Sequence, residues 1–180
     1  MLDRIEALTK SMAKSRTELL HAADSVTGEA WKASSGDGRW SAAELIAHLI
    51  QVERGVIAKA DRIVQHPPRR IPLLKRLHLP IAVVEVRVVK RKSPVPLAPE
   101  LLRDKEDMLG DLRGARERTL AFLAETSGRD LAEYYWPHPA LGMLNVYGWM
   151  RFLGSHEIRH AKQLREIVHD LRKPIGNLQK

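Results

Sequence analysis

The sequence predicts an all-α protein: a four-helix bundle with a long crossover between its second and third helices. Three observations support this class. Aromatic residues make up 5% of the 180 residues, and Leu, Ala and Ile carry most of the apolar weight, which favours helices over strands. Apolar residues recur at helical spacing in four long stretches. Clusters of proline and glycine separate these stretches. At this length we expect one domain, residues 1–180.

The first two helices are predicted on either side of a glycine- and serine-rich loop. Residues 3–24 carry a single apolar stripe, and residues 28–38 contain the turn-forming run SSGDG. Ser41 and Glu44 have the spacing of a capping box, in which each side chain accepts the other's backbone N–H. The second helix therefore begins after Ser41, and it must end before the proline pair at 67–68.

The last two helices are predicted after residue 98. Pro99 suits the first turn of a third helix, whose apolar stripe continues to about Thr126. Residues 128–142 are predicted to be a loop. Asn145 is then a plausible cap for the fourth helix, which ends by Pro174.

The crossover, at about residues 66–98, carries almost all of the excess charge. Residues 69–92 hold eight basic residues and one acidic residue, a net charge of +7, whereas the other 22 basic and 21 acidic residues nearly cancel. Five prolines in residues 69–99 predict helical turns and loop rather than one helix. Such a run is most often a solvated face. The alternatives are contact with nucleic acid or an anionic membrane surface, a lid near a site, or a dimer surface, and nucleic acid is the less expected partner.

The absence of cysteine restricts the chemistry of the chain. Disulfides, zinc fingers, iron–sulfur clusters and cysteine nucleophiles are excluded, so any metal must bind to His, Asp or Glu. If thiol chemistry occurs, the thiol must arrive on a small molecule. The start of the chain lacks the apolar core of a signal peptide, and residues 77–89 are too short and too charged to cross a bilayer, so we expect a cytoplasmic protein.

Three histidines are candidate metal ligands: His48, His156 and His160. His156 and His160 are four residues apart, which puts both imidazoles on one face of a helix, and both continue an apolar stripe. His48 continues the stripe of the second helix. Burying one unpaired imidazole costs about 1–3 kcal/mol, and a shared metal ion would relieve that cost for all three. The simpler alternative is that each is a core histidine held by an ordinary hydrogen bond.

Two segments also resemble a known family, the DinB-like (damage-inducible) superfamily. Residues 40–49, WSAAELIAHL, resemble its helix-2 signature, and residues 138–142 with 156–164 resemble its helix-4 signature. The resemblance implies an up-down-down-up bundle, often a homodimer, with a metal on His48, His156 and His160. Characterised members of that family include transferases and isomerases that use low-molecular-weight thiols such as bacillithiol, mycothiol or glutathione.

Together these features predict a protein that binds one divalent metal ion and acts as a metal-dependent transferase or hydrolase on a small-molecule substrate. Three imidazoles leave an open coordination position; zinc or nickel is expected first, with iron, cobalt or manganese as alternatives. Glu44 and Gln163 are candidates to support the ligands, although Glu44 has a capping role and Gln163 a solvated one as alternatives. No catalytic residue is evident. The alternative function is a non-catalytic binding protein with a structural or vestigial metal.

Four aromatic residues near the histidines have two interpretations. They either line a substrate pocket or pack in the core, and we expect packing. They are Trp40, Trp136, Tyr147 and Trp149.

Overall fold

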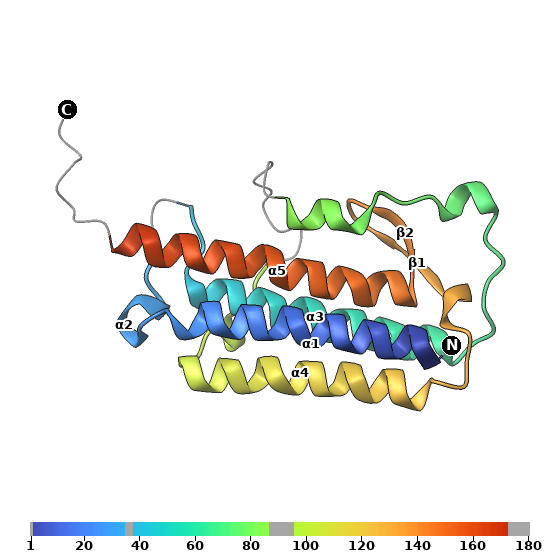
Figure 1. The fold of residues 1–180 in the computed structure, drawn as a ribbon, viewed down its shortest axis with the longest axis horizontal. Coiled ribbons are helices and arrows are strands. Elements are labelled where there is room, and N and C mark those ends of the chain that lie inside the picture. Colours follow the sequence, from blue (N-terminus) through green and yellow to red (C-terminus); the bar gives the residue numbers. More distant parts are fainter. Residues whose placement is uncertain (1, 35–37, 87–95, 173–180) are drawn as a thin grey trace.

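The computed structural model describes residues 2–34, 38–86 and 96–172. Four long helices lie side by side along the molecule (Figure 1): α1 (Leu2–Asp24), α3 (Ala42–Val64), α4 (Lys105–Glu125) and α5 (Val146–Leu171). Helices α1 and α5 run in one direction and α3 and α4 in the other (Figure 1). The predicted helical class is therefore confirmed. Among the described residues, no helix combines the length and apolarity that crossing a membrane requires.

The predicted caps of α3 and α5 are present. The Ser41 hydroxyl accepts the backbone N–H of Glu44 at 3.2 Å, and the Glu44 carboxylate accepts the N–H of Ser41 at 2.7 Å. The Asn145 side chain accepts the N–H of Gly148 at 2.8 Å. These bonds satisfy donors that the first turn of a helix leaves free, and so fix where the two histidine-bearing helices begin.

The predicted start of the third helix is wrong. Pro99 opens only a short 3₁₀ turn, η3 (Pro99–Leu101), and α4 begins at Lys105. Asp104 has an extended backbone and occupies the N-cap position. Acidic residues follow it in the first turn, where the positive end of the helix dipole favours them. This local signal outweighs the preference of proline for a first helical turn.

The two predicted loops contain short regular elements that the sequence did not indicate. The first holds α2 (Gly28–Trp31), capped by the Thr27 side chain. The second holds η4 (Leu131–Glu133) and an antiparallel hairpin of β1 (Tyr135–His138) and β2 (Gly142–Asn145). Four residues per strand are too few to show a clear alternating pattern in the sequence.

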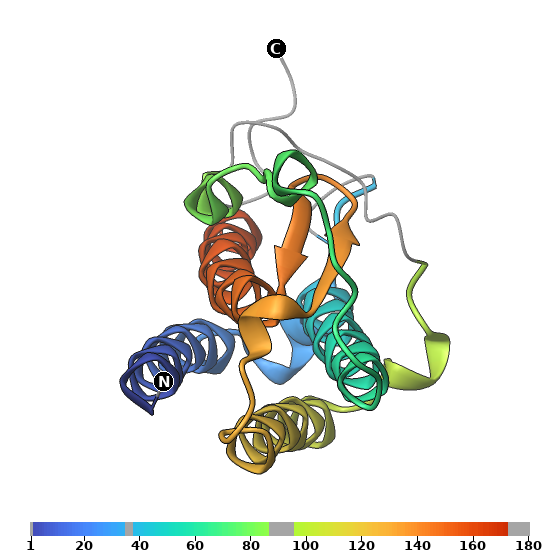
Figure 2. The same ribbon diagram turned by 90° about the vertical axis from the view of Figure 1, so that its right-hand side faces the viewer.

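The described part of the crossover, residues 66–86 and 96–98, consists of short helical turns and loop, as predicted; residues 87–95, which carry four of its basic residues, lie outside the described residues. Residues 73–86 form an outer layer over α5 and the hairpin (Figure 2). Its turns are η1 (Leu73–Arg76) and η2 (Ile81–Glu85). His78 forms an isolated antiparallel β-bridge with Gly142, and the Leu79 N–H donates to the Leu141 carbonyl at 2.8 Å. The Glu85 carboxylate accepts from the Ser155 hydroxyl of α5 at 2.8 Å. Residues 78–85 are thus attached both to the hairpin and to α5.

Candidate metal centre

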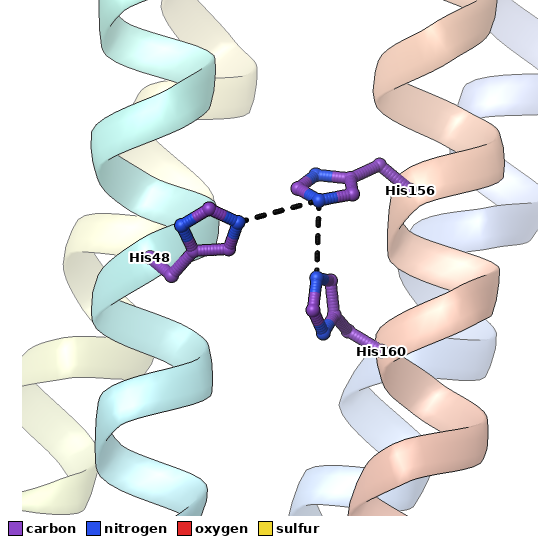
Figure 3. Close-up of side chains that lie close together, drawn as sticks. All are labelled: His48, His156 and His160. Carbon is purple, nitrogen blue, oxygen red and sulfur yellow. Dashed lines mark hydrogen bonds between the residues drawn. The ribbon is translucent and has the colours of Figure 1, made fainter. Parts of the chain in front are cut away.

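The structure brings the three predicted histidines together between two helices. His48 extends from α3, and His156 and His160 extend from one face of α5 (Figure 3). The residues are 7%, 9% and 6% exposed, respectively, and in Figure 3 the three rings point toward one another. The prediction that they share one interior location is therefore confirmed.

The Nε2 atoms converge at distances suited to one ion. Nε2 of His156 lies 3.3 Å from Nε2 of His48 and 3.0 Å from Nε2 of His160. A ligand atom from each residue lies within 4.8 Å of the others. In a tetrahedral zinc site with Zn–N bonds of about 2.0–2.1 Å, two ligand nitrogens are about 3.3 Å apart. The three imidazoles can therefore hold a metal ion with little rearrangement.

Gln163 orients the His160 ring. The Gln163 side-chain oxygen lies 3.0 Å from Nδ1 of His160. Because an amide oxygen only accepts, Nδ1 of His160 carries the proton and Nε2 presents its lone pair to the other two rings. Gln163 therefore contacts one of the predicted ligands, as its proposed supporting role requires. Glu44 instead accepts two bonds from Ser41 and so has the capping role that was its alternative.

Burial keeps His48 and His156 neutral. It lowers the pKa of His48 to about 4. It also lowers the pKa of His156 well below 6.5, and the neighbouring His160 and His48 lower it further. A neutral imidazole offers the lone pair that a metal needs, so these two rings are ready to bind an ion at neutral pH without first losing a proton.

Aromatic rings flank the histidines. Trp40 lies against the His48 ring with centroids 5.0 Å apart, and Phe152 stacks on the His156 ring at 4.9 Å. The His138 ring contacts the other side of this cluster, 4.4 Å from Phe152. Sequence reasoning did not single out Phe152, and it placed His138 in the predicted loop and in the family signature without a contact to the cluster. Phe152 had one available signal, its position one helical turn before His156.

The other three aromatic residues that the sequence analysis considered pack in the core, as expected. Trp136 and Trp149 stack with centroids 4.9 Å apart, and the Trp149 indole N–H donates to the Trp136 carbonyl at 3.3 Å. Tyr147 is buried in the same apolar cluster. These three pack in the core, whereas Trp40 contacts His48, one of the three predicted ligands.

Among the described residues, the histidine group has three members. Within the part of the chain that the structure describes, no fourth histidine or carboxylate joins it. A hollow of about 330 Å³ does lie elsewhere, lined in part by Arg54, Asp61 and Arg118, and it includes none of the three histidines. Three protein ligands with an open position are the pattern of catalytic rather than structural zinc sites.

A buried charge network lies next to the histidines and connects all four long helices. It comprises one residue from each helix: Arg16, Glu53, Arg116 and Glu157. Glu53 accepts from Arg16 at 2.8 Å and from Arg116 at 2.7 Å. Glu157 accepts from Arg16 at 2.7 Å and pairs with Arg116 at 3.0 Å. Two positive and two negative charges thus compensate one another in the interior.

This network connects α3, which carries His48, with α5, which carries His156 and His160. Glu53 follows His48 by five residues, and Glu157 directly follows His156, so both carboxylates lie close to ligand positions along their helices. Although burial disfavours a charged guanidinium, Glu157 and Glu53 raise the pKa of Arg116. A buried, fully paired network has one satisfied arrangement, and we infer that it sets the register in which the histidines meet.

Fold and site together define the class of the protein: a helical protein with three histidines gathered between two of its helices. The chain belongs to the DinB superfamily, whose sequence pattern matches residues 11–164. It is also similar to "Uncharacterized protein YuaE" of Bacillus subtilis (strain 168), with 29% identity over 136 residues, covering 74% of this chain and 80% of YuaE. No solved structure matches the chain.

Proposed function

We propose that the protein binds one divalent metal ion through His48, His156 and His160 and acts as a metal-dependent transferase or hydrolase. The observation that carries this proposal is the convergence of three Nε2 atoms from two helices: that of His156 lies 3.3 Å from that of His48 and 3.0 Å from that of His160. Zinc or nickel is the expected ion, with iron, cobalt or manganese as alternatives, because imidazole ligands do not distinguish among them.

The chemistry follows from the open position. A divalent ion held by three neutral imidazoles lowers the pKa of a water or thiol that reaches it, which supplies a nucleophile at neutral pH. The chain contributes the rest: Gln163 fixes the tautomer of His160, and Trp40 and Phe152 restrict the approach to the rings. Because the chain has no cysteine, a low-molecular-weight thiol would have to be a second substrate.

The test begins with elemental analysis of gently purified wild-type protein beside His48→Ala. We expect about one equivalent of a divalent metal in the wild type and a large loss in the variant. Turnover of an electrophile with a thiol should then require the metal and disappear in His160→Ala. Full activity in the metal-free protein contradicts the enzymatic part of the proposal, and absence of metal from the wild type after reconstitution contradicts both parts.

A second candidate function is binding without catalysis, with a structural metal. The low exposure of the three histidines and the aromatic rings packed on two of them favour this candidate. Cobalt substitution distinguishes the two. The visible spectrum of a Co²⁺ site changes when a thiol binds to an open position, whereas it stays constant if the site is closed to small molecules.

We further propose that residues 1–180 form a single domain, an up-down-down-up four-helix bundle with the crossover as an insert, and that it is a homodimer located in the cytoplasm. The antiparallel arrangement of the long helices supports the bundle (Figure 1). The dimer rests on the family resemblance alone, and light scattering of the purified protein tests it.

A further inference from the structure

Apolar side chains are unusually exposed in one segment, the crossover. Among the described residues, eight large hydrophobic side chains are exposed, and six of them lie between residues 73 and 86: Leu73, Leu74, Leu77, Leu79, Val83 and Val86. Three are 72–84% exposed. Exposing contiguous apolar side chains is unfavourable in water, so a surface of this kind marks a site of interaction with another apolar phase or molecule.

The exposure of these side chains does not result from loose packing of the segment. Ile81 and Val84 of the same segment pack against the core, while Val83 and Val86 project outward. Backbone hydrogen bonds anchor the segment to the hairpin, and Arg159 of α5 donates to the Val84 carbonyl at 3.2 Å and to the Val86 carbonyl at 2.9 Å. Residues 73–86 are thus held as an outer layer over α5 and the hairpin (Figures 1 and 2), and their remaining large apolar side chains are exposed.

The same surface is basic. Arg69, Arg70 and Lys75 are exposed beside the leucines, and none has an ion-pair partner among the described residues. The one acidic side chain of this stretch, Glu85, is turned inward and accepts from Ser155. Protruding aliphatic side chains bordered by unpaired cations are the composition of a surface that inserts at the boundary between lipid headgroups and acyl chains.

We propose that the crossover surface, residues 69–86, binds the surface of anionic lipid membranes, with the leucines inserted and the basic residues at the headgroups. A second copy of the chain is a poorer occupant, because it would bring an equally positive segment against this one. Nucleic acid would use the cations but would gain nothing from exposed leucines, and this stretch holds no Phe, Tyr or Trp on which bases could stack.

The test is cosedimentation of the full-length protein with lipid vesicles. Wild-type protein should bind vesicles of phosphatidylglycerol with phosphatidylcholine, should bind far less to phosphatidylcholine alone, and should be released by salt. Arg69→Gln with Arg70→Gln should weaken binding by about thirtyfold, at about 1 kcal/mol per basic residue. Leu73→Ser with Leu74→Ser should weaken it by at least about tenfold.

The matched control is Lys10→Gln with Lys14→Gln, which removes the same charge from exposed positions on α1 and should retain binding. Four results overturn the proposal: no binding to anionic vesicles at low salt, equal loss in the control and the arginine variant, binding that ignores the leucine substitutions, or a wild-type dimer that the leucine substitutions dissociate. Duplex DNA that displaces the vesicles and needs the arginines but not the leucines would instead assign the surface to nucleic acid.

Discussion

Replacing Glu53 by Gln tests whether the buried charge network holds the helices that carry the histidines. The Glu53 carboxylate accepts from Arg16, from Arg116 and from the Thr119 hydroxyl, at 2.7–2.8 Å. The substitution keeps the shape of the side chain but removes one of two negative charges facing two buried guanidinium groups. It also places an amide N–H, which can only donate, against groups that themselves donate.

The expected cost follows from leaving a buried cation without its partner, about 3–5 kcal/mol. With an unfolding entropy of about 2.1 cal/mol/K per residue over 180 residues, this loss lowers Tm by about 8–13 °C. The matched control is Asp61→Asn, which breaks the exposed Arg118–Asp61 pair; solvent screens that pair, so the cost should be about 0–1 kcal/mol.

Thermal unfolding followed by circular dichroism measures both variants, with the metal-free protein used throughout so that metal binding does not contribute. A Tm for Glu53→Gln within about 2 °C of wild type refutes the reasoning, because it means that the remaining groups satisfy one another without the second carboxylate. Metal titration of the folded variant adds a second readout: if the network sets the register of α3 and α5, affinity falls even where the fold persists.

Three further predictions concern the histidines and the crossover. Gln163→Leu should weaken metal binding by about 10–100-fold, measured by competition with a chelator, because it removes the acceptor that fixes His160; unchanged affinity contradicts that role. As pH falls from 6.5 to 4, the metal-free protein should lose about 3 kcal/mol of stability because of His48. The pKa of His48 is about 4 in the folded state and higher in the unfolded chain, so the unfolded state takes up the proton first. Chemical unfolding at each pH measures the loss. Because burial also lowers the pKa of His156 and of His138, part of the slope should remain in His48→Gln, and a slope as steep as that of the wild type contradicts the assignment. Gly142→Ala should detach the crossover from the hairpin and expose it to proteolysis. The glycine has φ +92°, and a Cβ there would lie 2.7 Å from the Leu77 carbonyl oxygen. An unchanged digestion pattern would show that the segment tolerates the substitution.

The local signals of the sequence were reliable where one short-range interaction decides the outcome. The capping box at Ser41 and the cap at Asn145 each need only a side chain and a backbone group three residues away, and both are present. The same local reasoning failed at Pro99, where two signals competed and the later one, at Asp104, prevailed. It also missed the β1–β2 hairpin, since pairing between strands of four residues depends on the packing around them.

The sequence by itself determined that His156 and His160 share one helical face and that His48 lies on another apolar stripe, because helical periodicity fixes which residues face the same way. Only the tertiary structure decided that the three rings meet, because their distance depends on how α3 and α5 are held against each other. No periodicity encodes that relation. Long-range contacts determine that distance, above all the contacts among the four buried charged residues. These residues lie up to 141 positions apart in the chain and become partners only after the helices have packed.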